Sequence, residues 1–155
     1  MVMGMDVGYK NSDGSFSLRS AALIIKDNKL LVAKNDSYDC FYTLGGGVNL
    51  NEVSTEAVIR ECREETGYDF EIDRLAFIQE RFFTLKNCHH HEVVFFYLMK
   101  NNDVDIKDGT ATDQQCEHLY WLPVDELEKT NLVPAFLKTA LKSMPKETVH
   151  IVSNE

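Results

Sequence analysis

Residues 45–67 constrain the fold more than any other part of this 155-residue chain. The stretch opens with three consecutive glycines, which is typical of a bend or of a close approach between the backbone and a ligand. The segment that follows predicts a helix that is capped by Asn51 or Ser54 and ends before Gly67. A strand-like run, residues 41–44, leads into the glycines. A strand, a bend and a helix therefore follow one another directly.

The predicted helix carries three glutamates on one side. At about 100° per residue, Glu61, Glu64 and Glu65 fall within roughly one 100° arc of its surface. Like charges at this spacing weaken an isolated helix, whereas Mg²⁺ or Mn²⁺ prefers carboxylate and other oxygen ligands and reverses the penalty. A solvated acidic face is the plain alternative for three such residues taken alone.

The spacing of residues 46–68 favours the metal interpretation. It resembles the signature of the Nudix hydrolase family of MutT-like enzymes, in which a glycine, a glutamate, an Arg-Glu pair, a Glu-Glu pair and a second glycine recur at set intervals. The resemblance is complete at the seven fixed positions, which are Gly46, Glu52, Arg60, Glu61, Glu64, Glu65 and Gly67. Cys62 and Tyr68 stand where the family more often has aliphatic residues, which predicts slightly different packing under the helix.

The resemblance implies an α/β fold class, the Nudix fold, which is an α/β/α sandwich with a mixed β-sheet. It also implies roles for the residues of the motif. The catalytic metal ligands would be Glu61, Glu64 and Glu65 together with the Gly45 carbonyl, and Glu61 acts on the attacking water in some members. Gly46 and Gly47 would contact the substrate, while Glu52, Arg60 and Gly67 would support the geometry of the loop and helix.

The implied activity is the cleavage of a phosphoanhydride bond in a nucleoside diphosphate linked to another group, by water that Mg²⁺ or Mn²⁺ activates. The family's markers for ADP-ribose, dinucleoside polyphosphates, NADH and coenzyme A are not recognisable in this chain. Nucleoside triphosphates and nucleotide sugars remain as predicted substrates. The alternative is a nucleotide-sensing module without catalysis, against which the intact glutamates argue. An isoprenoid diphosphate isomerase is a more remote alternative.

Three polar residues outside the motif are further candidates. Arg19 is a candidate phosphate ligand because a guanidinium matches phosphate geometry, although a surface ion pair explains it equally well. Many Nudix enzymes take another carboxylate, as base or ligand, from a loop that faces the motif. Glu117 is the first candidate for this catalytic role and Asp113 the second. The plain alternative for each is a solvated loop acid.

The run of residues 88–92 contains a cysteine, three histidines and a glutamate, which suggests zinc. Side chains alternate along a strand, so at most three of these five residues share a side. His91 and Glu92 look similar to a subgroup of Nudix proteins, which makes His91 a candidate for ligand recognition. A plain hairpin tip is the default interpretation. Aromatic side chains are candidates for stacking on a base or sugar, or for the core: Tyr42, Phe82, Phe83 and Phe96.

The remaining pattern predicts one domain, residues 16–155, after an N-terminal leader or edge segment, residues 1–15. Hairpins are predicted over residues 16–33, with a turn at 26–29, and over residues 72–99. Residues 101–115 read as a mobile acidic loop before a strand at 118–122. Helical segments are predicted at 124–128 and 134–143. The last segment, 148–152, is an edge strand or a frayed tail.

Composition narrows the classes of partner. A net charge of −9 argues against nucleic-acid binding, so the expected partner is a small nucleotide-type substrate. Four widely spaced cysteines indicate reduced thiols. Without a signal sequence or a long apolar run, we expect a cytoplasmic protein with no membrane association. A homodimer is an option by analogy with the family.

Overall fold

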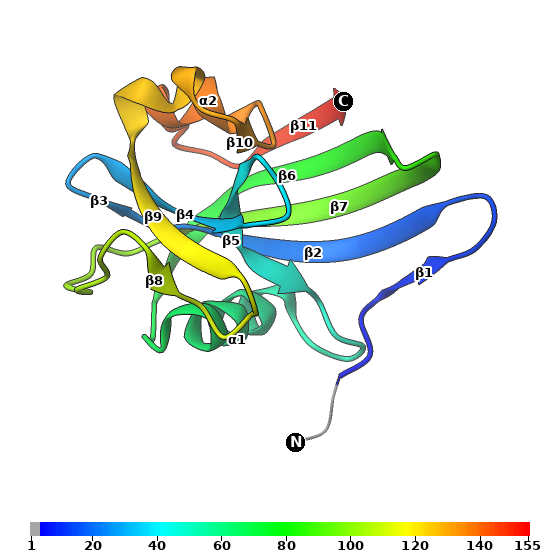
Figure 1. Cartoon of the computed structure of the whole chain (residues 1–155), viewed down its shortest axis with the longest axis horizontal. Helices are drawn as coiled ribbons and strands as arrows, with labels where there is room; N and C mark the ends of the chain where they lie inside the picture. The colour runs from blue at the N-terminus through cyan, green and yellow to red at the C-terminus, as the bar shows by residue number, and fades with distance from the viewer. Residues whose placement is uncertain (1–3) are drawn as a thin grey trace.

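The computed structural model describes residues 4–155, which form one large mixed sheet with helices on both faces (Figure 1). This confirms the predicted α/β/α layering. The strands are β1 (Gly8–Lys10), β2 (Ser15–Leu23), β3 (Ile25–Lys26), β4 (Lys29–Asn35), β5 (Phe41–Gly47), β6 (Ile72–Leu85), β7 (Cys88–Met99), β8 (Thr110–Ala111), β9 (Glu117–Pro123), β10 (Leu132–Val133) and β11 (Val149–Asn154). The main path through the sheet is β11-β6-β7-β2-β5-β4-β9-β8.

The helices lie in two layers. One face of the sheet is covered by α1 (Ser54–Thr66), and the opposite face by short segments, η1 (Val124–Lys129), α2 (Leu137–Ala140) and η2 (Leu141–Ser143) (Figure 1). Each layer has its own apolar core. Val58 and Cys62 of α1 are fully buried against one face, and Leu127 and Leu137 are fully buried against the other. Each such side chain contributes about 1.5–3 kcal/mol relative to exposure.

The first predicted hairpin is only partly correct. Its turn lies where expected, with Asp27 and Asn28 in the left-handed region, but the hairpin's first arm is only β3. The preceding apolar run belongs to β2, which pairs in parallel with β7 and antiparallel with β5. An apolar strand that is buried on both faces belongs in the centre of a sheet rather than at a hairpin.

The second hairpin is confirmed, since β6 and β7 pair antiparallel along most of their length. The last segment is an edge strand rather than a frayed tail, because β11 pairs in parallel with β6. The predicted helix over residues 134–143 is shorter than expected and is divided between α2 and η2.

Helix α1 ends as predicted but begins differently. Gly67 adopts a left-handed φ of 77° and its N–H donates to the Arg63 carbonyl, which closes the helix. At the other end, neither predicted cap is used. Val53 occupies the cap position, and the Ser54 hydroxyl instead lies 2.7 Å from the Tyr97 hydroxyl. A tertiary hydrogen bond has replaced the local one.

Two segments, predicted as a loose leader or edge segment and as a mobile acidic loop, are both attached to the sheet, and for the first the edge-segment alternative is correct. Residues 8–10 form the edge strand β1 against β2, whereas residues 1–3 lie outside the described part of the chain. In the acidic segment, Val104 and Ile106 are buried, and the Trp121 indole N–H donates to the Ile106 carbonyl. The prediction of a mobile loop is therefore wrong for this part, because two apolar side chains anchor it.

All four cysteines are free thiols, and burial raises the pKa of the Cys62 thiol. Within residues 4–155, no helix has the length and apolar character needed to cross a membrane.

Candidate active site

Arg60, in the middle of α1, connects the helix to the loop before it. Its guanidinium donates to both carboxylate oxygens of Glu52, at 2.7 and 3.0 Å, and to the Gly47 carbonyl at 3.1 Å. Glu52 in turn accepts the Asn49 N–H at 2.9 Å. The hydrogen bonds from Arg60 hold the pKa of Glu52 below its ordinary value. We call Arg60, Glu52 and Gly47 the brace, because they fix residues 45–50, the glycine loop, to the helix.

The three glycines are required by three different neighbours. A methyl group at Gly45 would lie 2.2 Å from the Ser20 carbonyl oxygen, and φ there is 146°. At Gly46 it would lie 2.4 Å from the carboxylate carbon of Glu61, and at Gly47 2.5 Å from an oxygen of Asp6. Contacts this short do not occur with real side chains, so the loop is held between a strand, the helix and the N-terminal segment.

Two acidic side chains are buried near Gly45, the first residue of the glycine loop. Glu65 of α1 is 5% exposed and accepts the Gly45 N–H at 3.2 Å. Glu117, at the start of β9, is 4% exposed and accepts hydrogen bonds from the Tyr42 hydroxyl at 2.5 Å and the Thr112 hydroxyl at 2.9 Å. We call Glu65 and Glu117 the acid pair.

The electrostatics of the acid pair are unfavourable. Burial, followed by the charges of Glu117 and Glu61, raises the pKa of Glu65 to about 9. Burial and the carboxylate of Glu117 also raise the pKa of the Tyr42 hydroxyl. A buried carboxylate with a neighbouring one binds a proton or a cation more readily than it stays ionised alone.

The other two predicted ligands lie closer to solvent. Arg60 contacts Glu61 at 2.7 Å and Glu64 at 3.6 Å, and the Glu64 side chain is 47% exposed. Burial raises the pKa of Glu61, although Arg60 opposes that shift. Across residues 4–155, no three His, Cys, Asp or Glu side chains already converge as a metal site. The carboxylates nevertheless fit a hard cation, since Glu65 and Glu61 supply oxygen donors with excess negative charge.

A cavity of about 500 Å³ opens beside the acid pair, and we call it the box cavity. Arg19, Gly45 and residues of the acid pair line one part of it, and Arg81 and Glu92 line another. Arg19 forms no ion pair within residues 4–155, and its charge lowers the pKa of Glu61. Arg81 is already paired with Glu92 at 3.5 Å and with Glu155 at 2.7 Å. Of the two arginines that line the box cavity in the described part of the chain, Arg19 is therefore the one without an ion pair.

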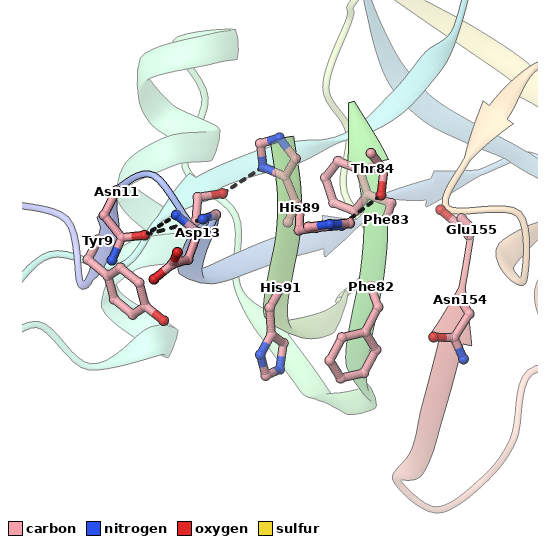
Figure 2. Close-up of a pocket in the computed structure, with 13 residues that line it drawn as sticks. Tyr9, Asn11, Asp13, Phe82, Phe83, Thr84, His89, His91, Asn154 and Glu155 are labelled. Atoms are coloured by element: carbon pink, nitrogen blue, oxygen red, sulfur yellow. Dashed lines mark hydrogen bonds between the residues drawn. The ribbon is translucent and has the colours of Figure 1, made fainter. Parts of the chain in front are cut away.

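His91 lies elsewhere, in a second cavity of about 560 Å³ at the tip of the β6–β7 hairpin (Figure 2). Its ring stacks on Phe82 with centroids 4.4 Å apart, and Phe16 packs against its edge. The structure does not bring His91 to the box cavity. Its contacts are those of an aromatic hairpin tip.

The aromatic candidates separate into different roles. Phe96 is 1% exposed and lies in the core, while Phe82 and Phe83 stack on histidines of β7. Tyr42 uses its hydroxyl to hold Glu117. Sequence reasoning missed this pairing and the ion pair of Arg81 with Glu155, because both join strands that are distant in sequence. The available signal was weak: a tyrosine in a central strand needs a partner for its hydroxyl.

The NUDIX domain model matches residues 17–142 of this chain, which therefore belongs to the Nudix family. The match covers α1, the acid pair, most of β2 and the strands from β3 to β10. It begins after β1 and ends before β11.

Individual relatives are more distant. The m7GpppN-mRNA hydrolase dcap-2 of Caenorhabditis elegans is 32% identical over 95 residues, which is 60% of this chain but only 12% of that protein. The MutT protein from Bacillus halodurans has a TM-score of 0.68 at 16% identity, covering 86% of this chain and 89% of its own. An ADP-ribose pyrophosphatase from Streptococcus suis has a TM-score of 0.56 at 17% identity, covering 86% and 98%. The similarity to these solved structures shows the fold.

Proposed function

We propose that this protein hydrolyses a phosphoanhydride bond in a nucleoside diphosphate linked to a further group, with Mg²⁺ or Mn²⁺ as cofactor. The observation that carries the proposal is the buried acid pair beside the glycine loop, because neither of its carboxyl groups forms an ion pair with a basic side chain within residues 4–155. Family membership supports hydrolysis. The relatives act on different substrates, as their names state, so the fold alone does not select one.

The metal would be held by Glu61, Glu64 and Glu65 together with the Gly45 carbonyl. When bound, such an ion neutralises phosphate charge and makes water a stronger nucleophile at neutral pH. It would also supply the positive charge that a protein of net charge −9 lacks. The free guanidinium of Arg19 would bind a phosphate oxygen in the box cavity.

Glu117 is our candidate for the residue that accepts a proton from the attacking water. Tyr42 and Thr112 each occupy one of its oxygens, which orients the carboxylate and leaves one lone pair on each oxygen. Among substrates we favour nucleoside triphosphates and nucleotide sugars. The cytoplasmic location and the homodimer stay predictions.

The experiment is a substrate panel. Purified protein is incubated with nucleoside triphosphates, nucleotide sugars, ADP-ribose, dinucleoside polyphosphates and the cap analogue m7GpppN, with Mg²⁺ or Mn²⁺, and products are separated by chromatography. We expect metal-dependent cleavage that Glu65→Gln and Glu64→Gln abolish, while Glu56→Gln, an exposed acid of the same helix, retains it. Nucleotide binding without turnover of any compound would replace the hydrolase with the sensing module.

A further inference from the structure

The N-terminal segment contacts the glycine loop directly. The Val7 N–H donates to the Val48 carbonyl at 2.8 Å, and the Leu50 N–H donates to the Met5 carbonyl at 2.7 Å. Asp6 and Asn49 form an antiparallel bridge between these two bonds. Residues 4–7, which we call the strap, therefore pair with residues 48–50 as a short strand would.

The strap is also tied to the sheet. The Leu18 N–H donates to the Val7 carbonyl at 3.0 Å, and residues 8–10 continue as β1 along β2. The Val48 N–H donates to the Leu18 carbonyl at 3.0 Å, so strap, strand and loop share one network of backbone bonds. Figure 1 shows the N-terminal segment beside the loop that leads into α1.

Asp6 occupies the space that Gly47 leaves by having no side chain. Both carboxylate oxygens of Asp6 lie within 2.8 Å of the position that a methyl group on Gly47 would take. Gly47 does not have a positive φ, so its backbone conformation does not by itself require glycine. On its other side, Gly47 accepts a hydrogen bond from Arg60 of the brace.

We infer that the strap positions the glycine loop for catalysis and that Asp6 is a positioning residue. This inference rests on the proposed hydrolase function. The loop is held from one side by the brace and from the other by the strap, which lies before the region matched by the family model. The segment that the sequence predicted to be a loose leader or an edge segment thus contributes to the geometry of the site.

The first test is kinetic, on the full chain with its best substrate. A misplacement of catalytic groups by about 1 Å costs up to about 100-fold in rate, and the strap contacts the loop rather than the substrate. We therefore expect Val7→Pro, which removes one N–H donor, to lower kcat about tenfold, and Asp6→Ala about fivefold, with KM changed less than twofold. Asp6→Asn, which keeps the shape, should retain kcat. Asp13→Ala, on the β1–β2 turn, is the control: it changes the net charge by the same amount as Asp6→Ala and should retain the wild-type kcat.

The second test is a double-mutant cycle. Gly47→Ala pushes the Asp6 carboxylate away, so Asp6→Ala and Gly47→Ala remove the same contact. We expect kcat of the double variant to lie within about twofold of the lower single variant, since mutations that share a contact are not additive. Independent, multiplying effects, or an Asp6→Ala enzyme with wild-type kcat, would refute the role of Asp6.

A third measurement needs no turnover and separates the strap from the hydrolase proposal. Amide hydrogen exchange at Leu50 should be slow in the wild type and at least about tenfold faster in Val7→Pro, and Mn²⁺ alone should bind that variant more weakly. Asp13→Ala should match the wild type in both. If Leu50 exchange and Mn²⁺ affinity were unchanged in Val7→Pro, the inference that the strap positions the glycine loop would be wrong, whatever the substrate panel shows.

Discussion

The brace and the acid pair contact different residues of one glycine loop, Gly47 and Gly45, yet the pKa values of their carboxyl groups are shifted in opposite directions. Glu52 has a guanidinium against both oxygens, and its pKa is lowered. Glu65 has only a backbone N–H and further acids nearby, and its pKa is raised to about 9. The comparison shows that the charge of Glu52 stabilises the structure, whereas the carboxyl group of Glu65 is left available for a ligand.

The largest expected effect is on turnover. Glu65→Gln keeps the shape of the side chain but removes the charge that we propose binds the metal. We expect kcat/KM to fall on the order of a hundredfold or more, measured under saturating Mg²⁺. A Glu65→Gln enzyme within threefold of the wild type would show that the acid pair is not part of the catalytic site.

The second prediction concerns pH and the metal-free protein in EDTA. The folded pKa of Glu65 is about 9 and its ordinary value 4.5, so between these values the folded state holds a proton that the unfolded state has released. The free energy of unfolding should therefore fall as pH rises from about 5 to 9, by roughly a few kcal/mol.

Glu65→Gln should flatten that slope and make the metal-free protein more stable than the wild type at pH 9. Denaturant unfolding at several pH values measures this. An equal slope in both proteins would assign the pH dependence to other groups.

The third prediction concerns the brace, for which the free energy of unfolding changes with pH in the opposite direction. Because the folded pKa of Glu52 is lowered, its stabilisation is present above pH 4.5 and is lost as pH falls through the folded pKa. Glu52→Gln should reduce the free energy of unfolding at pH 7 by about 1–3 kcal/mol, since it leaves Arg60 with a weaker partner. If Glu52→Gln and Glu65→Gln changed the free energy of unfolding in the same direction at pH 9, the contrast between the brace and the acid pair would be wrong.

The smallest expected effect comes from Tyr42→Phe. The substitution removes the hydroxyl that donates to Glu117 but keeps the ring, so we expect a loss of about 1 kcal/mol and a severalfold lower kcat. Tyr38→Phe is the matched control, because Tyr38 also lines the box cavity but is half exposed. Equal kinetic effects of the two substitutions would remove Tyr42 from its role in orienting Glu117.

The features that could be predicted from the sequence are those whose interacting residues lie close together along the chain. Helix α1 and its closure at Gly67 depend on neighbours a few residues away, and both were predictable. So was the β6–β7 hairpin, whose strands adjoin in sequence. The parallel pairing of β2 with β7 was not predictable, because it joins residues some 75 positions apart and leaves no local pattern.

The same limit applies to the site. The spacing of the motif identified Arg60, Glu61 and Glu65, but not which acids would be paired with a cation and which left alone. That distinction depends on Tyr42 and Thr112 reaching Glu117, and on Asp6 reaching Gly47. The Tyr42–Glu117 and Asp6–Gly47 contacts form only after separate parts of the chain have folded together, whereas Thr112 lies five residues from Glu117.

The anchoring of Val104 and Ile106 shows where the acidic segment is attached to the rest of the fold. These two side chains are buried and β8 pairs with β9, while residues 113–116, in the turn between β8 and β9, are exposed. Glu117 belongs to β9 rather than to this turn. The exposed turn contributes Gln114 to the lining of the box cavity, so substitutions in the turn are expected to change access to the cavity while the strand that carries the proposed proton acceptor stays in place.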